Sequence, residues 1–287
     1  MFHQWWDTEN PNGTVVIAHG ASEHMGRYGR FADALNAAGW AVAALDHRGH
    51  GKTRESTGTG RFGPSGAEGL LDDLDQLVEI TRERAPDKPV VVFGHSMGSV
   101  IVQAYVVTRD RDLAGYVLSG PLGVAEGGDE LLAGIQQALD AGMADEPVSL
   151  LGQFNEPFEP ARTPFDWLSR DPAEVDKYLA DPLCGDDNPL TYGYIAGVMK
   201  LGADGTDPQA ISAMAEVPVL LVAGEMDPAG GMTSNVRALE ERLRGRGLNV
   251  TAMYYPDARH EVLNETNRDE VTEDICNWLG GLPASEQ

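Results

Sequence analysis

The chain has 287 residues, of which 42% are hydrophobic and 7% aromatic; this allows a large buried core and excludes disorder as the default. Its 21 basic and 45 acidic residues give a formal net charge of −24, and such a surface repels nucleic acids and anionic membranes at long range. The two cysteines, Cys184 and Cys276, show no CxxC motif or metal-ligand spacing, so we expect no disulfide framework and a reducing compartment.

The N-terminal segment MFHQWWDTENPNG does not have the pattern of a signal peptide, because no basic segment precedes an apolar run. No window of the chain approaches the roughly 20 apolar residues of a membrane helix. We therefore expect a cytoplasmic protein; a secreted protein whose leader has been removed is the alternative. The composition indicates nothing about the oligomeric state.

Strand and helix patterns alternate over the first 121 residues. Apolar runs predict strands at residues 14–20, 40–46, 90–93 and 114–121. Helical spacing of apolar residues predicts helices at residues 28–39, 67–88 and 99–109. The predicted strands are nearly continuous apolar runs, which is typical of a parallel sheet covered by helices on both faces.

The second predicted helix carries a run of acidic residues. Its apolar positions, which we expect to face inward, are Leu70, Leu71, Leu74, Leu77 and Val78. Asp72, Asp73 and Asp75 fall between them, and we expect all three on a solvated face rather than in a metal site.

The alternation breaks at about residue 122. From there to about residue 205 the sequence has short helical patterns, prolines and aromatic residues, and we expect no strand. The pattern then resumes with a strand, helix, strand and helix at residues 217–224, 235–247, 249–256 and 269–282. We therefore predict an α/β core in two parts, residues 1–121 and 206–287, interrupted by a helical cap at residues 122–205.

One turn carries a candidate nucleophile. In VVVFGHSMGSV, residues 90–100, Ser96 lies between two glycines where an apolar strand ends and a helix-compatible run begins. The G-x-S-x-G pattern alone is a weak signal, and an ordinary strand-to-helix turn is the alternative. The strand–turn–helix context favours a nucleophile elbow, which exposes the serine hydroxyl at a strained apex and directs the backbone N–H of Met97 toward the site.

A serine nucleophile needs a histidine base and an orienting carboxylate. Of the seven histidines only His260 follows Ser96, and hydrolases with this elbow have the order nucleophile, acid, histidine. His260 lies after the last predicted strand. Asp227 lies just beyond the strand at residues 217–224, also at a carboxyl end, and is the favoured acid; Glu225 is its main rival.

The oxyanion produced by attack on a carbonyl needs fixed hydrogen-bond donors. One is the backbone N–H of Met97, and the second should come from a loop after an early strand. The segment VVIAHGASEH supplies Ala21 at that place, directly after His19 and Gly20.

Five short motifs occur together in this chain: HGASEHMGRY, DHRGHGKT, GHSMGS, GEMDP and RHEVLNE. A sixth segment, SRDPAEVDKYLADPL, lies in the predicted cap. Together they resemble the monoacylglycerol lipase and lysophospholipase-type branch of the serine α/β-hydrolases, over roughly residues 13–279. The resemblance implies an α/β-hydrolase fold with a cap, a triad of Ser96, Asp227 and His260, and oxyanion donors at Ala21 and Met97.

The same resemblance covers the charged loop that follows Ala21. Glu23, His24 and Arg27 match it, and we expect Glu23 and Arg27 to clamp the oxyanion loop. Glu261, beside His260, departs from the family at a position where an apolar residue is also common. The sequence shows neither a glycine-rich phosphate loop nor a metal-ligand cluster, so we expect no cofactor and no metal.

The reaction implied is ester hydrolysis through an acyl-enzyme formed on Ser96. The expected substrate is a monoacylglycerol, cleaved to fatty acid and glycerol. A short-chain carboxylesterase or a lysophospholipase is the alternative within this class. A catalytically silent binding protein of this fold is the alternative outside it, and the intact order of triad residues argues against that one.

The predicted cap carries an aromatic-rich stretch, with Phe154, Phe158, Phe165 and Trp167 among prolines. These rings either line an acyl channel or pack the cap on the core, and we take Phe158 and Trp167 as the candidate substrate contacts. The expected partner is a small-molecule ester, with no nucleic acid and at most transient membrane contact through the cap.

Overall fold

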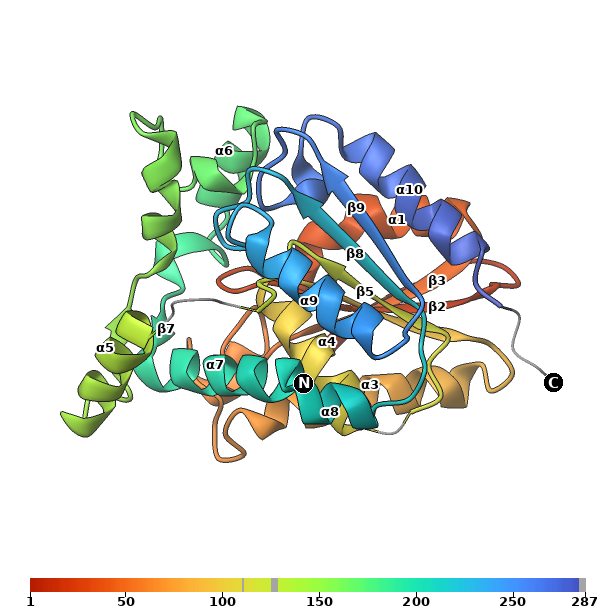
Figure 1. Ribbon diagram of the computed structural model, residues 1–287, viewed down its shortest axis with the longest axis horizontal. Coiled ribbons are helices and arrows are strands. Elements are labelled where there is room, and N and C mark those ends of the chain that lie inside the picture. Colours follow the sequence, from red (N-terminus) through yellow and green to blue (C-terminus); the bar gives the residue numbers. More distant parts are fainter. Residues whose placement is uncertain (110, 125–128, 284–287) are drawn as a thin grey trace.

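The computed structural model describes residues 1–109, 111–124 and 129–283. Over these residues its centre is a seven-stranded sheet in the order β1-β3-β2-β4-β5-β8-β9 (Figure 1). The strands are β1 Phe2–Trp6, β2 Gly13–Ala18, β3 Trp40–Asp46, β4 Val90–His95, β5 Gly115–Ser119, β8 Val219–Gly224 and β9 Val250–Tyr255. β1 pairs antiparallel with β3, and every other neighbouring pair in this sheet is parallel, which confirms the predicted fold class.

Helices cover both faces of the sheet. On one face lie α1 Gly29–Ala37 and α10 Arg268–Gly280; on the other lie α3 Glu68–Arg84, α4 Met97–Thr108 and α9 Ser234–Gly245 (Figure 1). The side chains of β4 alternate between two buried clusters: Val91 and Phe93 join the first face, Val90 and Val92 the second. Burial on both faces explains why these strands are continuous apolar runs.

Shorter helices connect the core elements. They are the 3₁₀ helix η1 Met25–Tyr28, α2 Arg54–Thr57 and the 3₁₀ helix η5 Val262–Asn264. Among the described residues, no helix combines the length and the hydrophobicity needed to span a bilayer.

The cap elements follow β5 and lie beside the sheet (Figure 1). They are α5 Asp129–Asp140, β6 Pro147–Val148, η2 Leu151–Phe158, η3 Asp166–Leu168, α6 Pro172–Ala180, η4 Gly185–Asp187, β7 Leu190–Thr191 and α7 Tyr192–Thr206, with α8 Pro208–Ala213 leading back to β8. The expectation that this region has no strand was wrong, because β6 and β7 pair antiparallel. Strands of two residues are too short to produce a readable hydrophobic pattern.

The last cap helix packs directly on the core. Gln103 on α4 donates a hydrogen bond from Nε2 to the carbonyl of Gly205 on α7, at 3.0 Å. A Cβ at Gly205 would lie 2.8 Å from the backbone nitrogen of Ala104, so the two helices approach as closely as a glycine permits. The predicted end of the cap at residue 205 therefore falls within a helix that packs against α4 of the core.

The structure differs from the sequence-based prediction at two further places. β1 was not predicted, because it is a half-exposed edge strand in which His3 and Gln4 break the apolar run. Asp73 is not on the solvated face of α3, since its side chain is 8% exposed and Arg48 binds both carboxylate oxygens, at 2.8 and 2.9 Å. Asp72 is exposed, as expected.

Candidate active site

Ser96 occupies a strained turn between β4 and α4. Its φ of 52° and ψ of −117° place a residue with a side chain in a region that usually favours glycine. The flanking glycines permit the close approach of the neighbouring elements: a Cβ at Gly94 would meet the carbonyl of Gly98, and a Cβ at Gly98 would meet the carbonyl of Ala18 on β2. The local geometry is that of a nucleophile elbow.

His260 and Asp227 form a buried pair. His260 Nδ1 donates to Asp227 Oδ2 at 2.9 Å, and their side chains are 2% and 1% exposed. The other oxygen of Asp227 accepts the backbone N–H of Ala229 at 2.9 Å. Because Nδ1 carries the proton, Nε2 is a free acceptor, and it is buried without a hydrogen-bond partner in the described part of the chain. Glu225, the rival acid, is exposed.

Ser96 and His260 line one cleft of about 280 Å³, together with Ala21. The cleft also receives cap residues that sequence reasoning did not select, Leu151 and Tyr178. The structure therefore brings the predicted nucleophile, base and one predicted oxyanion donor to a common space.

The loop that carries Ala21 is held by the side chains around Gly20. The Gly20 N–H donates to Glu23 Oε1 at 2.5 Å, and the Gly20 carbonyl accepts from His19 Nδ1 at 2.7 Å. His19 Nε2 in turn accepts the backbone N–H of His47 at 3.1 Å, so the proton of this neutral ring lies on Nδ1. In a trans peptide the carbonyl and the next N–H point in opposite directions, so fixing the Gly20 carbonyl also fixes the Ala21 N–H.

Met97, the second predicted donor, is the first residue of α4. The N–H groups in the first turn of a helix have no acceptor within that helix. They also carry the partial positive charge of the helix dipole, which favours an anion placed before the helix. Met97 directly follows Ser96, so its N–H is one of these first-turn groups; its side chain is buried and does not line the cleft.

The two candidate cap residues have different surroundings. Trp167 is 2% exposed, lines the cleft, and its ring centroid lies 4.8 Å from that of His260. Phe158 does not line this cleft; its ring packs under the guanidinium of Arg259 at 4.1 Å and against the apolar cluster of the cap. Sequence reasoning treated the rings alike because spacing along an irregular segment does not show which way each one faces.

A second anchor joins the oxyanion loop to the cap. The carbonyl of Ser22 accepts both the backbone N–H of Gly185 and the hydroxyl of Tyr178, each at 3.0 Å. The Ser22 hydroxyl donates to the carbonyl of Asn188, also at 3.0 Å. One buried serine therefore ties the loop after β2 to cap residues more than 150 positions later in the chain.

A family model described as serine aminopeptidase, S33, matches residues 9–267. The chain belongs to this family. The monoacylglycerol lipase of Mycolicibacterium smegmatis is 32% identical to it over 97% of the chain and 92% of that lipase. A carboxyl esterase from Bacillus coagulans, solved with glycerol, superposes with a TM-score of 0.90 at 31% identity, over 98% and 93% of the two chains. Paleococcus ferrophilus monoacylglycerol lipase superposes with a TM-score of 0.74 at 27% identity, over 97% of each chain.

These matches confirm the resemblance stated from the sequence motifs.

In this member of the serine aminopeptidase family, the surroundings of two neighbouring histidines, His95 and His260, shift their pKa values in opposite directions. Burial and, to a smaller extent, the nearby His260 lower the pKa of His95 to about 4, although Glu23 and Glu261 oppose this. Burial would also lower the pKa of His260, but Asp227 outweighs it, with Glu261 and Glu23 adding to the rise above 6.5. His95 therefore stays neutral where His260 can accept a proton.

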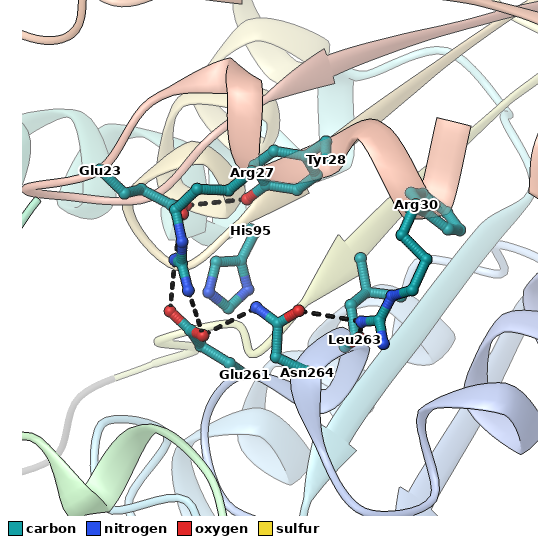
Figure 2. Close-up of a pocket in the computed structure, with 9 residues that line it drawn as sticks. Glu23, Arg27, Tyr28, Arg30, His95, Glu261, Leu263 and Asn264 are labelled. Carbon is teal, nitrogen blue, oxygen red and sulfur yellow. Dashed lines mark hydrogen bonds and ion pairs between the residues drawn. The ribbon is translucent and has the colours of Figure 1, made fainter. Parts of the chain in front are cut away.

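At the wall of the cleft, a buried guanidinium joins two carboxylates; we call Glu23, Arg27 and Glu261 the Glu–Arg–Glu bridge (Figure 2). All three residues also line the neighbouring pocket that this figure shows. Glu23 and Arg27, the two residues expected to clamp the oxyanion loop, form an ion pair, with 2.5 Å between Glu23 Oε2 and Arg27 Nη1. Sequence reasoning missed Glu261 as the third member. Burial alone would raise the pKa of Glu23, but Arg27, with the nearby histidines, lowers it to about 2.

One group of potential metal ligands is present among the described residues. Potential ligand atoms of His24, Asp181 and Cys184 lie within 4.8 Å of one another. His24 Nε2 and Asp181 Oδ2 already share a hydrogen bond of 2.9 Å, and burial raises the pKa of the Cys184 thiol, which opposes formation of the thiolate that metals bind. The chemistry of this donor set does not favour a metal.

Proposed function

We propose that this enzyme hydrolyses monoacylglycerols to free fatty acid and glycerol, with Ser96 as nucleophile, His260 as base and Asp227 as the orienting acid. The observation that carries the proposal is the buried His260–Asp227 pair, whose free Nε2 lies in the same cleft as the strained Ser96. The chain itself is a carboxylic ester hydrolase of the α/β-hydrolase fold. The proposed substrate draws on its similarity to the mycolicibacterial monoacylglycerol lipase.

The proposed reaction has two halves. His260 Nε2 takes the proton of the Ser96 hydroxyl as the oxygen attacks the ester carbonyl, and the N–H groups of Ala21 and Met97 stabilise the resulting oxyanion. The C–O bond to the alcohol then breaks, and His260 returns the proton to the departing oxygen. A water molecule, deprotonated by His260, attacks the acyl-enzyme; the bond to the Ser96 oxygen breaks, His260 returns the proton to that oxygen, and the acid leaves.

Asp227 has a separate role in this scheme. It holds His260 in the tautomer whose Nε2 accepts a proton, and its charge stabilises the imidazolium that forms twice in each cycle. We also propose that the cap, residues 122–205, covers the cleft and selects the acyl chain, with Trp167 as its contact beside His260.

A carboxylesterase acting on shorter esters is the second candidate. It is favoured by the close superposition on the Bacillus coagulans carboxyl esterase. The bulky Trp167 side chain that lines the cleft also suits a small acyl group.

The test that separates these candidates is an acyl-length series. kcat/KM is measured for p-nitrophenyl esters of increasing length, for monoacylglycerols and for a lysophospholipid. A monoacylglycerol lipase gives its highest kcat/KM with a long-chain monoacylglycerol. A maximum at acetate or butyrate assigns the chain as a short-chain carboxylesterase. A preference for the lysophospholipid assigns it as a lysophospholipase instead of either candidate.

A further inference from the structure

The Glu–Arg–Glu bridge links two loops of the cleft that are far apart in sequence. Arg27 Nη1 contacts Glu23 Oε2 at 2.5 Å and Glu261 Oε1 at 2.6 Å, and Arg27 Nη2 contacts Glu261 Oε2 at 2.7 Å. Figure 2 shows the guanidinium standing between the two carboxylates, with His95 beside it. One nitrogen serves both acids, so the guanidinium cannot follow one carboxylate without lengthening its bond to the other.

Each end of the bridge is attached to a different part of the site. Glu23 uses its other oxygen to accept the N–H of Gly20, one residue before the proposed donor Ala21. Glu261 directly follows His260, and its backbone N–H donates to the carbonyl of Leu168 in the cap at 2.7 Å. A displacement of the histidine loop is therefore transmitted through three side chains to the oxyanion loop.

The bridge is shielded from solvent. The side chains of Glu23, Arg27 and Glu261 are 3%, 11% and 6% exposed. The three side chains meet solvent only along the pocket that Figure 2 shows, so removing one charge leaves another poorly solvated in a medium of low dielectric constant. A neutral apolar residue after His260 could fill this space without either hydrogen bond to Arg27. Packing alone therefore does not account for a glutamate at position 261.

We propose that Arg27 is a positioning residue which, through Glu261 and Glu23, holds the base loop and the oxyanion loop in one fixed relation during catalysis. This inference rests on the proposed roles of His260 and Ala21. It adds that the two loops are energetically coupled, and that Glu261 carries part of that coupling.

The charge of Glu261 also gives the bridge a signature in the pH profile. The titratable and charged groups that face His260 are Asp227 after β8, Glu23 on the oxyanion loop, His95 at the end of β4, and Glu261 beside it. Both glutamates favour the imidazolium. Removing the Glu261 charge therefore lowers the pH at which His260 becomes protonated, and activity extends further into acid.

The first test is Glu261→Gln, which keeps the shape and removes the charge. We expect kcat on a p-nitrophenyl ester to fall about 10- to 100-fold with KM changed much less, since a misplacement of about 1 Å can cost about 10²-fold. The acid limb of the kcat/KM profile should move to lower pH by about one unit. An unchanged kcat and an unchanged acid limb would overturn the proposal.

The second test measures the coupling itself. Glu23→Gln keeps an acceptor for the Gly20 N–H, and the double variant Glu23→Gln/Glu261→Gln completes a cycle. If the loops are coupled through Arg27, the kcat of the double variant lies within about threefold of the worse single variant, because parts of one unit do not lose activity additively. Losses that multiply would mean that each loop is held independently, and would overturn the coupling.

Asp73→Asn is the matched control. It breaks another buried, bidentate arginine–carboxylate pair, with Arg48, between α3 and the loop after β3. We expect it to lower the melting temperature while leaving the acid limb in place. A shift of the acid limb equal to that of Glu261→Gln would assign the effect to general destabilisation.

Arg27→Lys keeps the test decisive if a glutamine variant does not fold. A lysine supplies one point charge and cannot bind two carboxylates as the planar guanidinium does, so kcat should again fall about 10-fold or more. Full kcat in Arg27→Lys overturns the proposal. Failure of the proposed catalytic roles is distinguishable, because a fluorophosphonate would then leave Ser96 of the wild-type chain unlabelled.

Discussion

The sheet and the cap of this molecule differ in how deeply their residues are buried and in the role that we propose for each. Every residue of β2, β4 and β8 is buried, and the proposed nucleophile Ser96 and acid Asp227 lie just beyond the ends of β4 and β8. The aromatic part of the cap consists of short 3₁₀ helices and turns, with Phe165 and Trp167 buried and Phe154 and Phe158 only partly covered. The proposed chemistry is therefore attached to the part of the molecule with the larger buried apolar clusters, whereas the proposed selection of substrate lies in a part with far fewer buried apolar residues.

The largest effect expected is in the core. Ser96→Ala should abolish ester hydrolysis while preserving the fold, because loss of the nucleophile in a serine hydrolase costs on the order of 10⁶ in kcat. The measurement is kcat on a p-nitrophenyl ester beside a circular dichroism spectrum and a melting curve. A fluorophosphonate adduct found on any other residue would remove Ser96 from the mechanism.

The second prediction compares two acids at the end of β8. Asp227→Asn should cost ~10⁴ in kcat, since asparagine cannot stabilise the imidazolium and favours the wrong tautomer of His260. Glu225→Gln, two residues away on an exposed side chain, should change kcat by less than about twofold. The reverse ranking of the two variants would make Glu225 the triad acid.

The third prediction concerns acid stability, which we assign to the core. Burial lowers the pKa of His50 to about 3 and that of His95 to about 4, while both rings titrate near 6.5 in the unfolded chain. The unfolded chain therefore binds more protons as pH falls below 6.5, and each of these histidines should cost the fold about 2 kcal/mol at pH 5 relative to pH 7.5. The raised pKa of His260 acts in the opposite direction and offsets part of this loss.

Urea unfolding midpoints at pH 7.5 and pH 5.0 measure this dependence. The variant His50→Gln should reduce the difference in unfolding free energy between the two pH values by about 2 kcal/mol. An equal pH dependence in the variant and the wild type would show that His50 is not held neutral by the fold.

The smallest effect is expected in the cap, and it sharpens the comparison between Trp167 and Phe158. Trp167 lines the cleft, so Trp167→Ala should lower kcat/KM for a long-chain ester more than for acetate, by about 0.8 kcal/mol for each lost methylene contact. Phe158 packs under Arg259, so Phe158→Ala should lower the melting temperature and affect both esters equally. Chain-length selectivity that changes in Phe158→Ala but not in Trp167→Ala would exchange these assignments.

The fold was accessible from the sequence where burial is two-sided. Continuous apolar runs marked β2, β3, β4 and β8, and glycines marked the elbow around Ser96. β1 was missed because a half-exposed edge strand needs no such run, and β6 and β7 because their pairing joins Pro147 to Thr191 across the cap. In each case the deciding contact is made with a distant part of the chain.

The candidate site, like the fold, could be predicted from the sequence only in part. The order of residues along the chain and their positions at strand ends selected Ser96, Asp227 and His260, but Glu225 stayed the main rival of Asp227 as the acid. Burial separates the two acids in the structure, and burial at a single turn is not encoded in local spacing. Glu261 was visible as an acid beside a histidine, yet its contact with Arg27 spans 234 positions, and no local pattern predicts such a pairing.

The three hydrogen bonds around Ser22 limit how the enzyme can admit its substrate. They fasten the cap at Tyr178, Gly185 and Asn188 to the loop that carries the proposed oxyanion donor. A cap that swung away at this point would pull the loop with it and dismantle the site each time it opened. Substrate entry without that damage leaves these three contacts in place, so the part of the cap around Tyr178, Gly185 and Asn188 serves as a fixed wall of the site.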